Sequence, residues 1–368
     1  MNFASDNASG ASEKILRALG AANAGPATAY GGDAFSSAAA VRLCEIFERD
    51  CAVHLVSTGT AANALALAAL TPPWGAVFCH EEAHIGEDEC GAPEFYTGGA
   101  KLVGVAGENG KLTPAALAAT LKRFPRGVPH HVQGAALSLS QVTEAGTVYS
   151  RSELAALSAV ARQAGLHVHM DGARFANALL ALGCTPAEMT WKAGIDVLSF
   201  GATKNGALAC EAVIFFDPAK AANFTFQRKR GGHTWSKGRF LGAQMAAYLE
   251  GNHWLETASH ANACAARLAK GLAAIPGVRL AFPAEANEVF PIVPRAAETA
   301  LRVAGAQIYE WVCRSVPPAL RPGPGEVPLR LVTSFATQDA EIEALLAIVR
   351  QAVPEAANVS TLPQSSSK

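Results

Sequence analysis

A lysine set among small residues is one candidate for chemistry in this sequence. Residues 199–206 read Ser-Phe-Gly-Ala-Thr-Lys-Asn-Gly, and Lys204 follows an apolar run that ends at Phe200. Lysine is rarely buried without a reason, and a Schiff base with a carbonyl compound is such a reason. An ordinary surface lysine in a loop is the alternative. Because the next run, residues 209–216, is apolar, Lys204 belongs to no exposed basic stretch, which favours the Schiff base.

A carboxylate and an arginine lie together after another apolar run. Asp171-Gly-Ala-Arg174 follows residues 166–170, so Asp171 is expected at the carboxyl end of a buried strand, where ligands bind in open α/β sheets. A buried carboxylate needs a partner, and a protonated pyridine nitrogen is a suitable one. Arg174 is near enough in sequence to reach the phenolic oxygen or phosphate of the same cofactor. A capped helix with a surface arginine is the alternative.

A possible phosphate cradle precedes both. Thr58, Gly59 and Thr60 stand between the apolar run 51–56 and an alanine-rich helical segment. The free N–H groups at such a helix start can bind phosphate, although many Ser/Thr turns are only helix caps. With Asp171 and Lys204 in this order, the three features predict a pyridoxal-phosphate (PLP) site.

Two histidine patterns favour a different class, a metal-dependent hydrolase. His80-Glu-Glu-Ala-His84 matches the zinc-protease pattern H-E-x-x-H, which requires both histidines on one face of a helix. Here the pattern starts where an expected strand ends. His167 and His169 alternate with Asp171 on one strand face, as in some metal sites, but no further ligand cluster supports them. We therefore expect no metal and keep the hydrolase as an alternative.

The elements that position these residues alternate between strand-length apolar runs and helical segments, which is typical of a mostly parallel sheet with crossover helices. Thr113-Pro114 predicts a helix start, and Ser150 with Glu153 predicts a capping box. The expected strands are residues 51–56, 76–79, 101–106, 132–140, 166–170, 196–200 and 209–216.

After residue 216 the alternation of strand-length apolar runs with helical segments ends, and longer helical segments follow. Helices are expected at 243–251, 257–272, 298–315 and 339–352, and strands at 278–282, 289–293 and 329–334. We therefore expect a large domain over residues 1–250, a smaller α+β domain over 251–353, and a disordered tail over 354–368.

The composition excludes several partners. The chain has 30 Lys and Arg against 31 Asp and Glu, so no net field attracts nucleic acid or an acidic membrane surface. No apolar run reaches membrane-spanning length, and no signal peptide is evident. The eight cysteines are scattered singly and are expected to be reduced, so a cytoplasmic location is predicted.

Taken together, the motifs resemble the L-threonine aldolase family of fold-type I PLP enzymes, also called the β-eliminating lyase-like group. The resemblance extends from the N-terminus to about residue 350. It implies an α/β fold of the PLP-dependent transferase type, with a smaller C-terminal domain. The stretches that carry it are Ser5-Asp-Asn, Ala29-Tyr-Gly-Gly-Asp, Ser57-Thr-Gly-Thr-Ala-Ala-Asn, Glu82-Ala-His, His169-Met-Asp-Gly-Ala-Arg, the Lys204 segment and Leu329-Arg-Leu-Val-Thr.

The resemblance also implies roles for single residues. His84 would stack on the cofactor ring, and His131 would be a second active-site histidine, so that Lys204, Asp171 and these two histidines form the catalytic set. Ser5, Arg330 and Arg174 would bind the substrate carboxylate. Tyr30 would reach the cofactor of a neighbouring subunit in a homo-oligomer, a dimer of dimers. The implied cofactor-binding residues are Lys204, Thr58, Gly59, Thr60, His84, Asp171, Arg174, Thr203, Tyr30 and Lys237.

The implied reaction is a retro-aldol cleavage of L-β-hydroxy-α-amino acids, such as L-threonine, L-allo-threonine or L-phenylserine, to glycine and an aldehyde. Two departures from the family pattern leave the substrate range open. Around the lysine this chain has Gly-Ala-Thr-Lys-Asn-Gly-Ala where many members have Ser-Leu-Ser-Lys-Gly-Leu-Gly, and Arg230, Lys237 and Arg239 could each replace an arginine that contacts phosphate. An aminotransferase and a catalytically silent protein of the same fold are the alternatives within PLP proteins.

Overall fold

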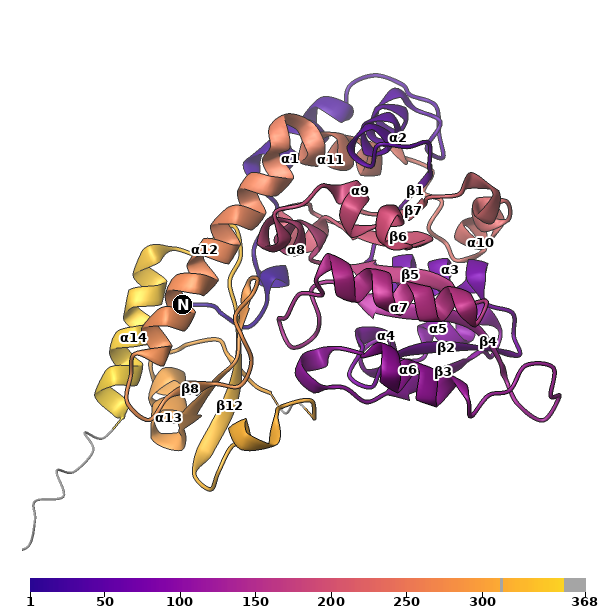
Figure 1. Ribbon diagram of the computed structural model, residues 1–368. Helices are drawn as coiled ribbons and strands as arrows, with labels where there is room; N and C mark the ends of the chain where they lie inside the picture. The colour runs from indigo at the N-terminus through magenta and orange to yellow at the C-terminus, as the bar shows by residue number, and fades with distance from the viewer. Residues whose placement is uncertain (312–313, 354–368) are drawn as a thin grey trace, which may run out of the picture.

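A computed structural model describes residues 1–311 and 314–353 of the chain, which form two sheets with their covering helices (Figure 1). The larger sheet has seven strands in the order β1-β7-β6-β5-β4-β2-β3. Its strands are parallel except β7, which runs antiparallel to both neighbours. Their bounds are β1 Ala52–Val56, β2 Gly75–His80, β3 Lys101–Val105, β4 Gln133–Ser140, β5 His167–Gly172, β6 Val197–Gly201 and β7 Glu211–Phe215.

Helices cover both faces of this sheet. On one face Val168 and Met170 of β5 pack in one cluster with Leu157 of α7. On the other face Val77 of β2 and Leu65 of α3 belong to a second cluster. A sheet buried on both faces explains why its strands are almost continuously apolar. The helices of this part are α3 Gly59–Leu70, α4 His84–Glu87, α5 Ala92–Thr97, α6 Pro114–Leu121, α7 Arg151–Gln163, α8 Phe175–Leu182, α9 Pro186–Met189 and α10 Phe224–Arg230.

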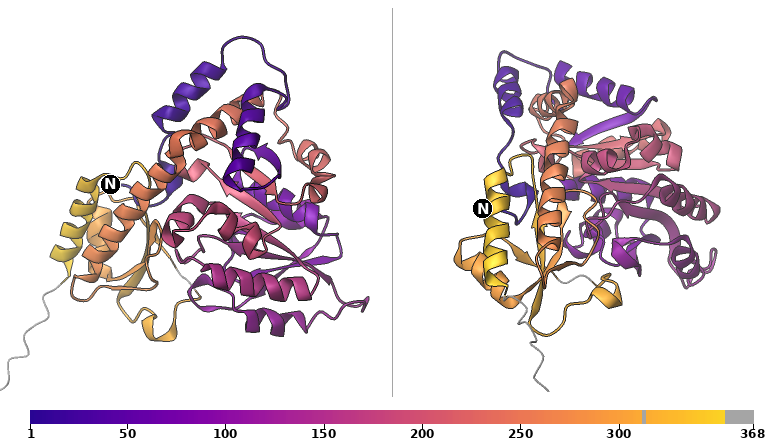
Figure 2. Two further views of the ribbon diagram at one scale, coloured as in Figure 1. Left: turned by 45° about the horizontal axis from the view of Figure 1, so that its top comes forward. Right: turned by 60° about the vertical axis from the view of Figure 1, so that its left-hand side comes forward.

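Three helices lie beyond the β1 end of the sheet, and a long helix leads away from them (Figure 1). The three are α1 Glu13–Ala22, α2 Ala34–Ile46 and α11 Arg239–Leu249. The long helix, α12 His253–Ala273, carries the chain to the smaller sheet, where it lies beside α14 Asp339–Ala352 (Figure 2).

The smaller sheet is antiparallel. Its order is β11-β12-β10-β8, and β9 also pairs with β12. Its own hydrophobic cluster joins β12 to α12, α13 and α14. The bounds are β8 Arg279–Leu280, β9 Glu288–Val289, β10 Pro291–Pro294, α13 Arg295–Val303, β11 Tyr309–Glu310 and β12 Glu326–Val332.

The N-terminal segment packs on the smaller sheet before it reaches the larger one. Phe3 is fully buried in the small cluster; its N–H donates to Gln307 O (2.9 Å), and Val332 N donates to Phe3 O (2.8 Å). The short helix η1 Asp6–Ala8 then enters the space between the sheets. The division of the chain near residue 250 stays a prediction, with which the two separate sheets are compatible.

The predicted elements agree with this fold, with two exceptions. The seven strands of the larger sheet, the capping box of Ser150 with Glu153, and the helix over 339–352 are confirmed. The single helix expected over 298–315 is wrong, because α13 ends at Val303 and the chain turns through Gly305 (φ +76°) into β11. The single strand expected over 289–293 is wrong, because Phe290 separates β9 from β10. The predicted tail at 354–368 and Cys313 lie outside the described residues.

Two further expectations concern the described part of the chain. Its seven cysteines are free thiols, and Cys44 Sγ lies 2.9 Å from Cys51 Sγ. None of the helices in this part combines the length and the apolar character that crossing a membrane requires.

Candidate active site

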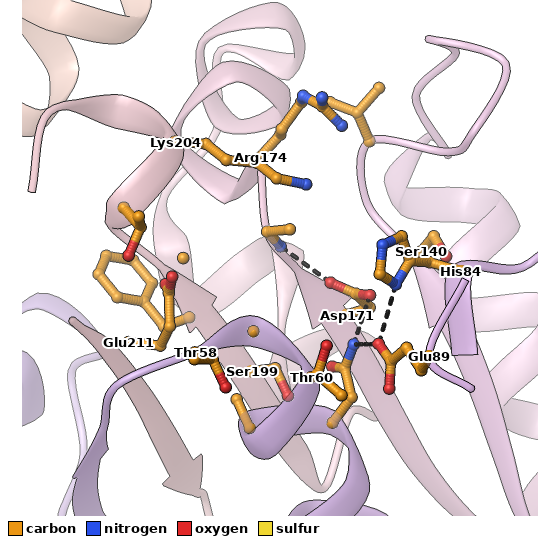
Figure 3. Close-up of a pocket in the computed structure, with 18 of the residues that line it drawn as sticks. Thr58, Thr60, His84, Glu89, Ser140, Asp171, Arg174, Ser199, Lys204 and Glu211 are labelled. Atoms are coloured by element: carbon orange, nitrogen blue, oxygen red, sulfur yellow. Dashed lines mark hydrogen bonds and ion pairs between the residues drawn. The ribbon is translucent and has the colours of Figure 1, made fainter. Parts of the chain in front are cut away.

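A cavity of about 330 Å³ opens at the carboxyl ends of β4, β5 and β6 (Figure 3). This volume is in the range of small-molecule sites. Lys204, in the short helix η4 Thr203–Asn205 after β6, points its amine into the cavity. The wall also contains Asn7, Thr58, Gly59, Thr60, Asn63, His84, Glu89, Ser140, Glu144, Asp171, Arg174, Ser199, Thr203 and Glu211.

The start of α3 forms one wall. Thr58 is the N-cap, and its Oγ1 accepts a hydrogen bond from Ala61 N (3.2 Å). The preceding first-turn amides, those of Gly59 and Thr60, have no acceptor within the helix. A Cβ placed on Gly59 would meet nothing within 4 Å, so the approach to these amides is open. This wall can bind an anionic group such as a phosphate.

Asp171, in β5, is the buried anion of the cavity. Asn63 Nδ2 donates to its Oδ2 (2.7 Å) and Ala173 N donates to its Oδ1 (3.0 Å). Burial alone would raise the pKa of Asp171, but the charges of His84 and Lys204 and the Ala173 N–H hold that pKa below its usual value. The carboxylate is therefore available to a cationic partner in the cavity.

His84, the first residue of α4, lies beside Asp171 (Figure 3). Its Nδ1 lies 2.9 Å from Glu89 Oε1, and this hydrogen bond raises the pKa of His84 above its usual value, against the effect of burial. Asn63 Nδ2 also donates to Glu89 Oε1 (2.8 Å). The Asn63 amide therefore hydrogen-bonds both to Glu89, which orients His84, and to Asp171.

The histidines of β5 do not form a metal site. His169 is fully buried between Ser138 Oγ and Ser199 Oγ, each 2.9 Å from one ring nitrogen. Burial lowers the pKa of His169 to about 4, so the ring is neutral. His167 is half-buried at the start of β5, and its Nδ1 lies 3.8 Å from Asp196 Oδ2. The alternative of a metal-dependent hydrolase that uses His167 and His169 is therefore wrong.

The hypothesis that His80 and His84 form a zinc-protease motif is also wrong. His80 ends β2 and His84 begins α4, so the two are not on one helix. His80 Nε2 lies 3.0 Å from Gly107 O, and its Nδ1 accepts from Glu82 N. His84, Glu89 and Asp171 do place three ligand atoms within 4.8 Å of one another. The Asn63 amide, however, already lies against both carboxylates.

Arg174 is tied to the N-terminal segment. Its Nε and one terminal nitrogen donate to Asp6 (2.7 and 3.1 Å), and its other terminal nitrogen lies 3.3 Å from Glu288 Oε2. Burial would lower the pKa of Arg174, but Asp6 and Glu288 raise it, so the guanidinium stays charged. Asp6 thereby connects η1 to the wall of the cavity.

Two carboxylic acids complete the wall. Glu211 accepts from Ala202 N (2.7 Å), and burial raises its pKa to about 7. Glu144 Oε1 accepts from Ser140 Oγ (2.6 Å) and from His84 N (2.8 Å), and burial raises its pKa to about 7 as well. Both groups exchange a proton close to neutral pH.

His131 is not brought to the cavity of its own chain. It is exposed in the turn before β4, whereas the cavity lies at the other end of that strand, at Ser140. Eight residues at about 3.3 Å each put roughly 26 Å between the two ends. The predicted role of His131 beside Lys204 is therefore wrong for the site in this chain.

Four other predicted residues also lie outside the wall. Ser5 caps η1 by accepting from Asn7 N (3.1 Å), and Asn7 lines the cavity instead. The Arg330 guanidinium covers the Trp311 ring at 4.2 Å and donates to Ala4 O (3.2 Å). Tyr30 and Lys237 are exposed; Tyr30 lines a separate hollow beside His233, whose Nδ1 lies 3.0 Å from Ser57 Oγ.

Three acids of the wall and their amide partner were not predicted as site residues. Glu89 and Glu144 stand in loops, where single carboxylates resemble surface residues. Glu211 is the easiest of the three acids to recognise from the sequence, because it is a lone acid at the start of an apolar strand. Asn63 is the last residue of the stretch 57–63 that carries the family resemblance. The polar residues missed in the wall include Asn7, Asn63, Glu89, Ser140, Glu144, Ser199 and Glu211.

Known proteins resemble this chain over most of its length. The model of the family described as "Beta-eliminating lyase" matches residues 2–295. The chain belongs to the beta-eliminating lyase family. It is therefore a lyase, as predicted, and the resemblance to L-threonine aldolases is confirmed by the family's relatives.

Two curated relatives of this family are named low specificity L-threonine aldolase. The one from Pseudomonas sp. (strain NCIMB 10558) is 44% identical over 95% of this chain and 96% of its own length. The one from Pseudomonas aeruginosa is 47% identical over 84% of this chain and 89% of its own length. These names do not favour the aminotransferase alternative.

Solved structures confirm the fold class. Threonine aldolase from Leishmania major superposes with a TM-score of 0.87 at 31% identity, over 95% of this chain and 98% of that chain. A serine palmitoyltransferase from Sphingomonas wittichii shares the fold, with a TM-score of 0.69 at 16% identity over 96% of this chain and 86% of that chain.

Proposed function

We propose that this protein cleaves L-β-hydroxy-α-amino acids to glycine and an aldehyde with PLP as cofactor. The observation that carries the proposal is one cavity that holds the Lys204 amine, the Asp171 carboxylate and the free amides of α3. The names of the curated relatives support the same activity.

The residues present fit PLP. Asp171 is a buried carboxylate that remains ionised, as a cationic ring nitrogen requires, and the open amides at Gly59 and Thr60 suit a phosphate. Lys204, in the same cavity, would bind the cofactor aldehyde. When bound, PLP supplies an electron sink for the bond that breaks at Cα.

The chain's own residues would do the remaining work. Arg174 is the cation of the wall best suited to a substrate carboxylate, and Asp6 and Glu288 fix its orientation. Glu89 orients His84, whose ring would lie against the cofactor. The Lys204 Nζ would return a proton to Cα as glycine forms.

We further propose that the protein is a homo-oligomer in the cytoplasm. Tyr30 (54% exposed) and Trp235 (38% exposed) border the same hollow beside Ser57, which supports a subunit contact close to the cavity. Lys237, nearby in sequence, would then serve a neighbouring subunit. The location rests on the free thiols of the seven cysteines in the described part of the chain.

A substrate panel tests the activity. Purified protein with PLP is mixed with L-threonine, L-allo-threonine and L-phenylserine, and glycine and aldehyde are measured. We expect equal amounts of both products and an absorption band that borohydride removes. Transfer of the amino group to an added keto acid, without glycine release, would instead support an aminotransferase.

A further inference from the structure

Glu144 has an unusual position for a carboxylic acid. It lies four residues after Ser140, at the carboxyl end of β4, and lines the same cavity as Lys204 and Asp171. Its Oε1 accepts both hydrogen bonds that the side chain receives, from Ser140 Oγ and His84 N. Its Oε2 is shielded from solvent and has no hydrogen-bond partner among the described residues. One oxygen is therefore anchored and the other is left for a proton.

The surroundings of Glu144 allow it to hold or release that proton near neutrality. Burial disfavours the anion, and Asp171 on β5 adds like charge, whereas the Ser140 hydroxyl and the His84 amide favour the anion. Two further ionisable groups face it, the Cys79 thiol of β2 and the Tyr149 hydroxyl, and burial keeps both neutral. The balance raises the pKa of Glu144 to about 7, where a general acid–base group is most effective.

We propose that Glu144 is the acid–base residue for the β-hydroxyl group of the substrate. The proposal rests on the function proposed above. As carboxylate, Glu144 takes the proton of the Cβ hydroxyl; the Cα–Cβ bond breaks, the oxygen becomes the aldehyde carbonyl, and the bonding pair remains on Cα. Protonated Glu144 then passes its proton to water that enters the cavity after the aldehyde leaves, or returns it to an aldehyde in the reverse direction.

His84 is less suited to this step. Its Nδ1 is engaged by Glu89, which raises the pKa of the ring, so at neutral pH a larger fraction of His84 is protonated and cannot accept a proton. His131, at the far end of β4, cannot reach the cavity. Glu144, and not His131, is therefore the acid–base group beside His84 in this cavity.

The conservative variant Glu144→Gln separates this role from a structural one. Because both observed hydrogen bonds end on Oε1, a glutamine can keep them through its amide oxygen and lose only the titrating proton. We expect kcat for L-threonine cleavage to fall by about 10²- to 10⁴-fold with KM little changed, and the acidic limb of the pH profile near 7 to disappear. Glu285→Gln is the matched control, since Glu285 also accepts a backbone amide (Val148 N, 2.6 Å) but lies outside the cavity.

A second readout needs no turnover. Infrared titration of the cofactor-free protein should show a protonated carboxyl band that fades near pH 7 and is weakened in Glu144→Gln; Glu211 contributes to the remainder. If Glu144→Gln does not fold, Ser140→Ala provides the test: it removes a hydrogen bond to the anion and should shift the acidic limb to higher pH.

The outcomes are distinct. Wild-type protein that releases no glycine from any β-hydroxy amino acid overturns the proposed function, and the role of Glu144 with it. Wild-type cleavage together with a Glu144→Gln kcat within about threefold of wild type and an unchanged limb overturns the role of Glu144 alone. If the acidic limb of the pH profile stays at its wild-type pH in Ser140→Ala, the role of Glu144 is likewise overturned.

Discussion

The side-chain amide of Asn63 donates a hydrogen bond to Asp171 at 2.7 Å, and the same nitrogen donates to Glu89 at 2.8 Å. Asn63 is buried in α3, the helix whose start forms the anion-binding wall. A single residue thus holds two carboxylates together that would otherwise repel each other. Asn63 thus links Glu89, which orients His84, to Asp171, which is expected to face the cofactor ring.

Replacing Asn63 should therefore weaken cofactor binding. In Asn63→Ala the two carboxylates lose their shared donor, which should cost about 1–3 kcal/mol of folding stability and raise the Kd for PLP. Fluorescence titration of the cofactor-free protein with PLP measures the latter. The control is Asn177→Ala: Asn177 is also buried and donates to Asn262 (2.8 Å), but in α8, away from the cavity. An equal loss of PLP affinity in both variants would argue against the bridge.

Glu89 should set the charge of His84. The hydrogen bond raises the pKa of His84 in the folded protein, so it contributes stability that is fully present below about pH 6.5 and is lost as the pH rises through the folded pKa. In Glu89→Gln we expect the NMR titration midpoint of His84 to move to lower pH and this stability contribution to vanish. A midpoint at or above the wild-type value would contradict the pairing.

Glu211 should make the cofactor-free protein less stable at higher pH. Its carboxyl titrates near 4.5 when unfolded and near 7 when folded. Between these values the folded state keeps a proton that the unfolded state has lost, so stability falls with rising pH, by roughly 3 kcal/mol in all.

Chemical denaturation of the cofactor-free protein from about pH 5 to pH 9 checks this prediction. Glu211→Gln should remove the contribution of Glu211 and leave a smaller decline from Glu144, since the amide oxygen can still accept from Ala202 N. The exposed Glu108, changed to Gln, should leave the decline as in wild type. A decline of wild-type size in Glu211→Gln would show that Glu211 is ionised in the folded state throughout this range.

The fold and the main pair of the site could be predicted because their signals are local. Continuous apolar runs specify strands buried on both faces, and Asp171 and Lys204 each follow such a run. The order of the strands then brings them together, since β5 and β6 are neighbours. This part of the prediction needs no knowledge of distant contacts.

The rest depends on contacts between segments far apart in sequence. Nothing near Arg174 indicates that Asp6 would pair with it, and nothing near Glu144 indicates that it would accept the backbone amide of His84. The misplacement of His131 is different. The expected strand 132–140 already put this residue at the amino end of β4, so strand direction alone excluded it from the carboxyl edge.

The most direct test of the account compares wild-type protein with Lys204→Ala, both supplied with PLP, for release of glycine and acetaldehyde from L-threonine. We predict equal amounts of the two products from the wild type, and a rate lower by at least about 10³-fold in Lys204→Ala, because the variant loses both the covalent anchor and the proton donor at Cα. Full turnover in Lys204→Ala would contradict the account.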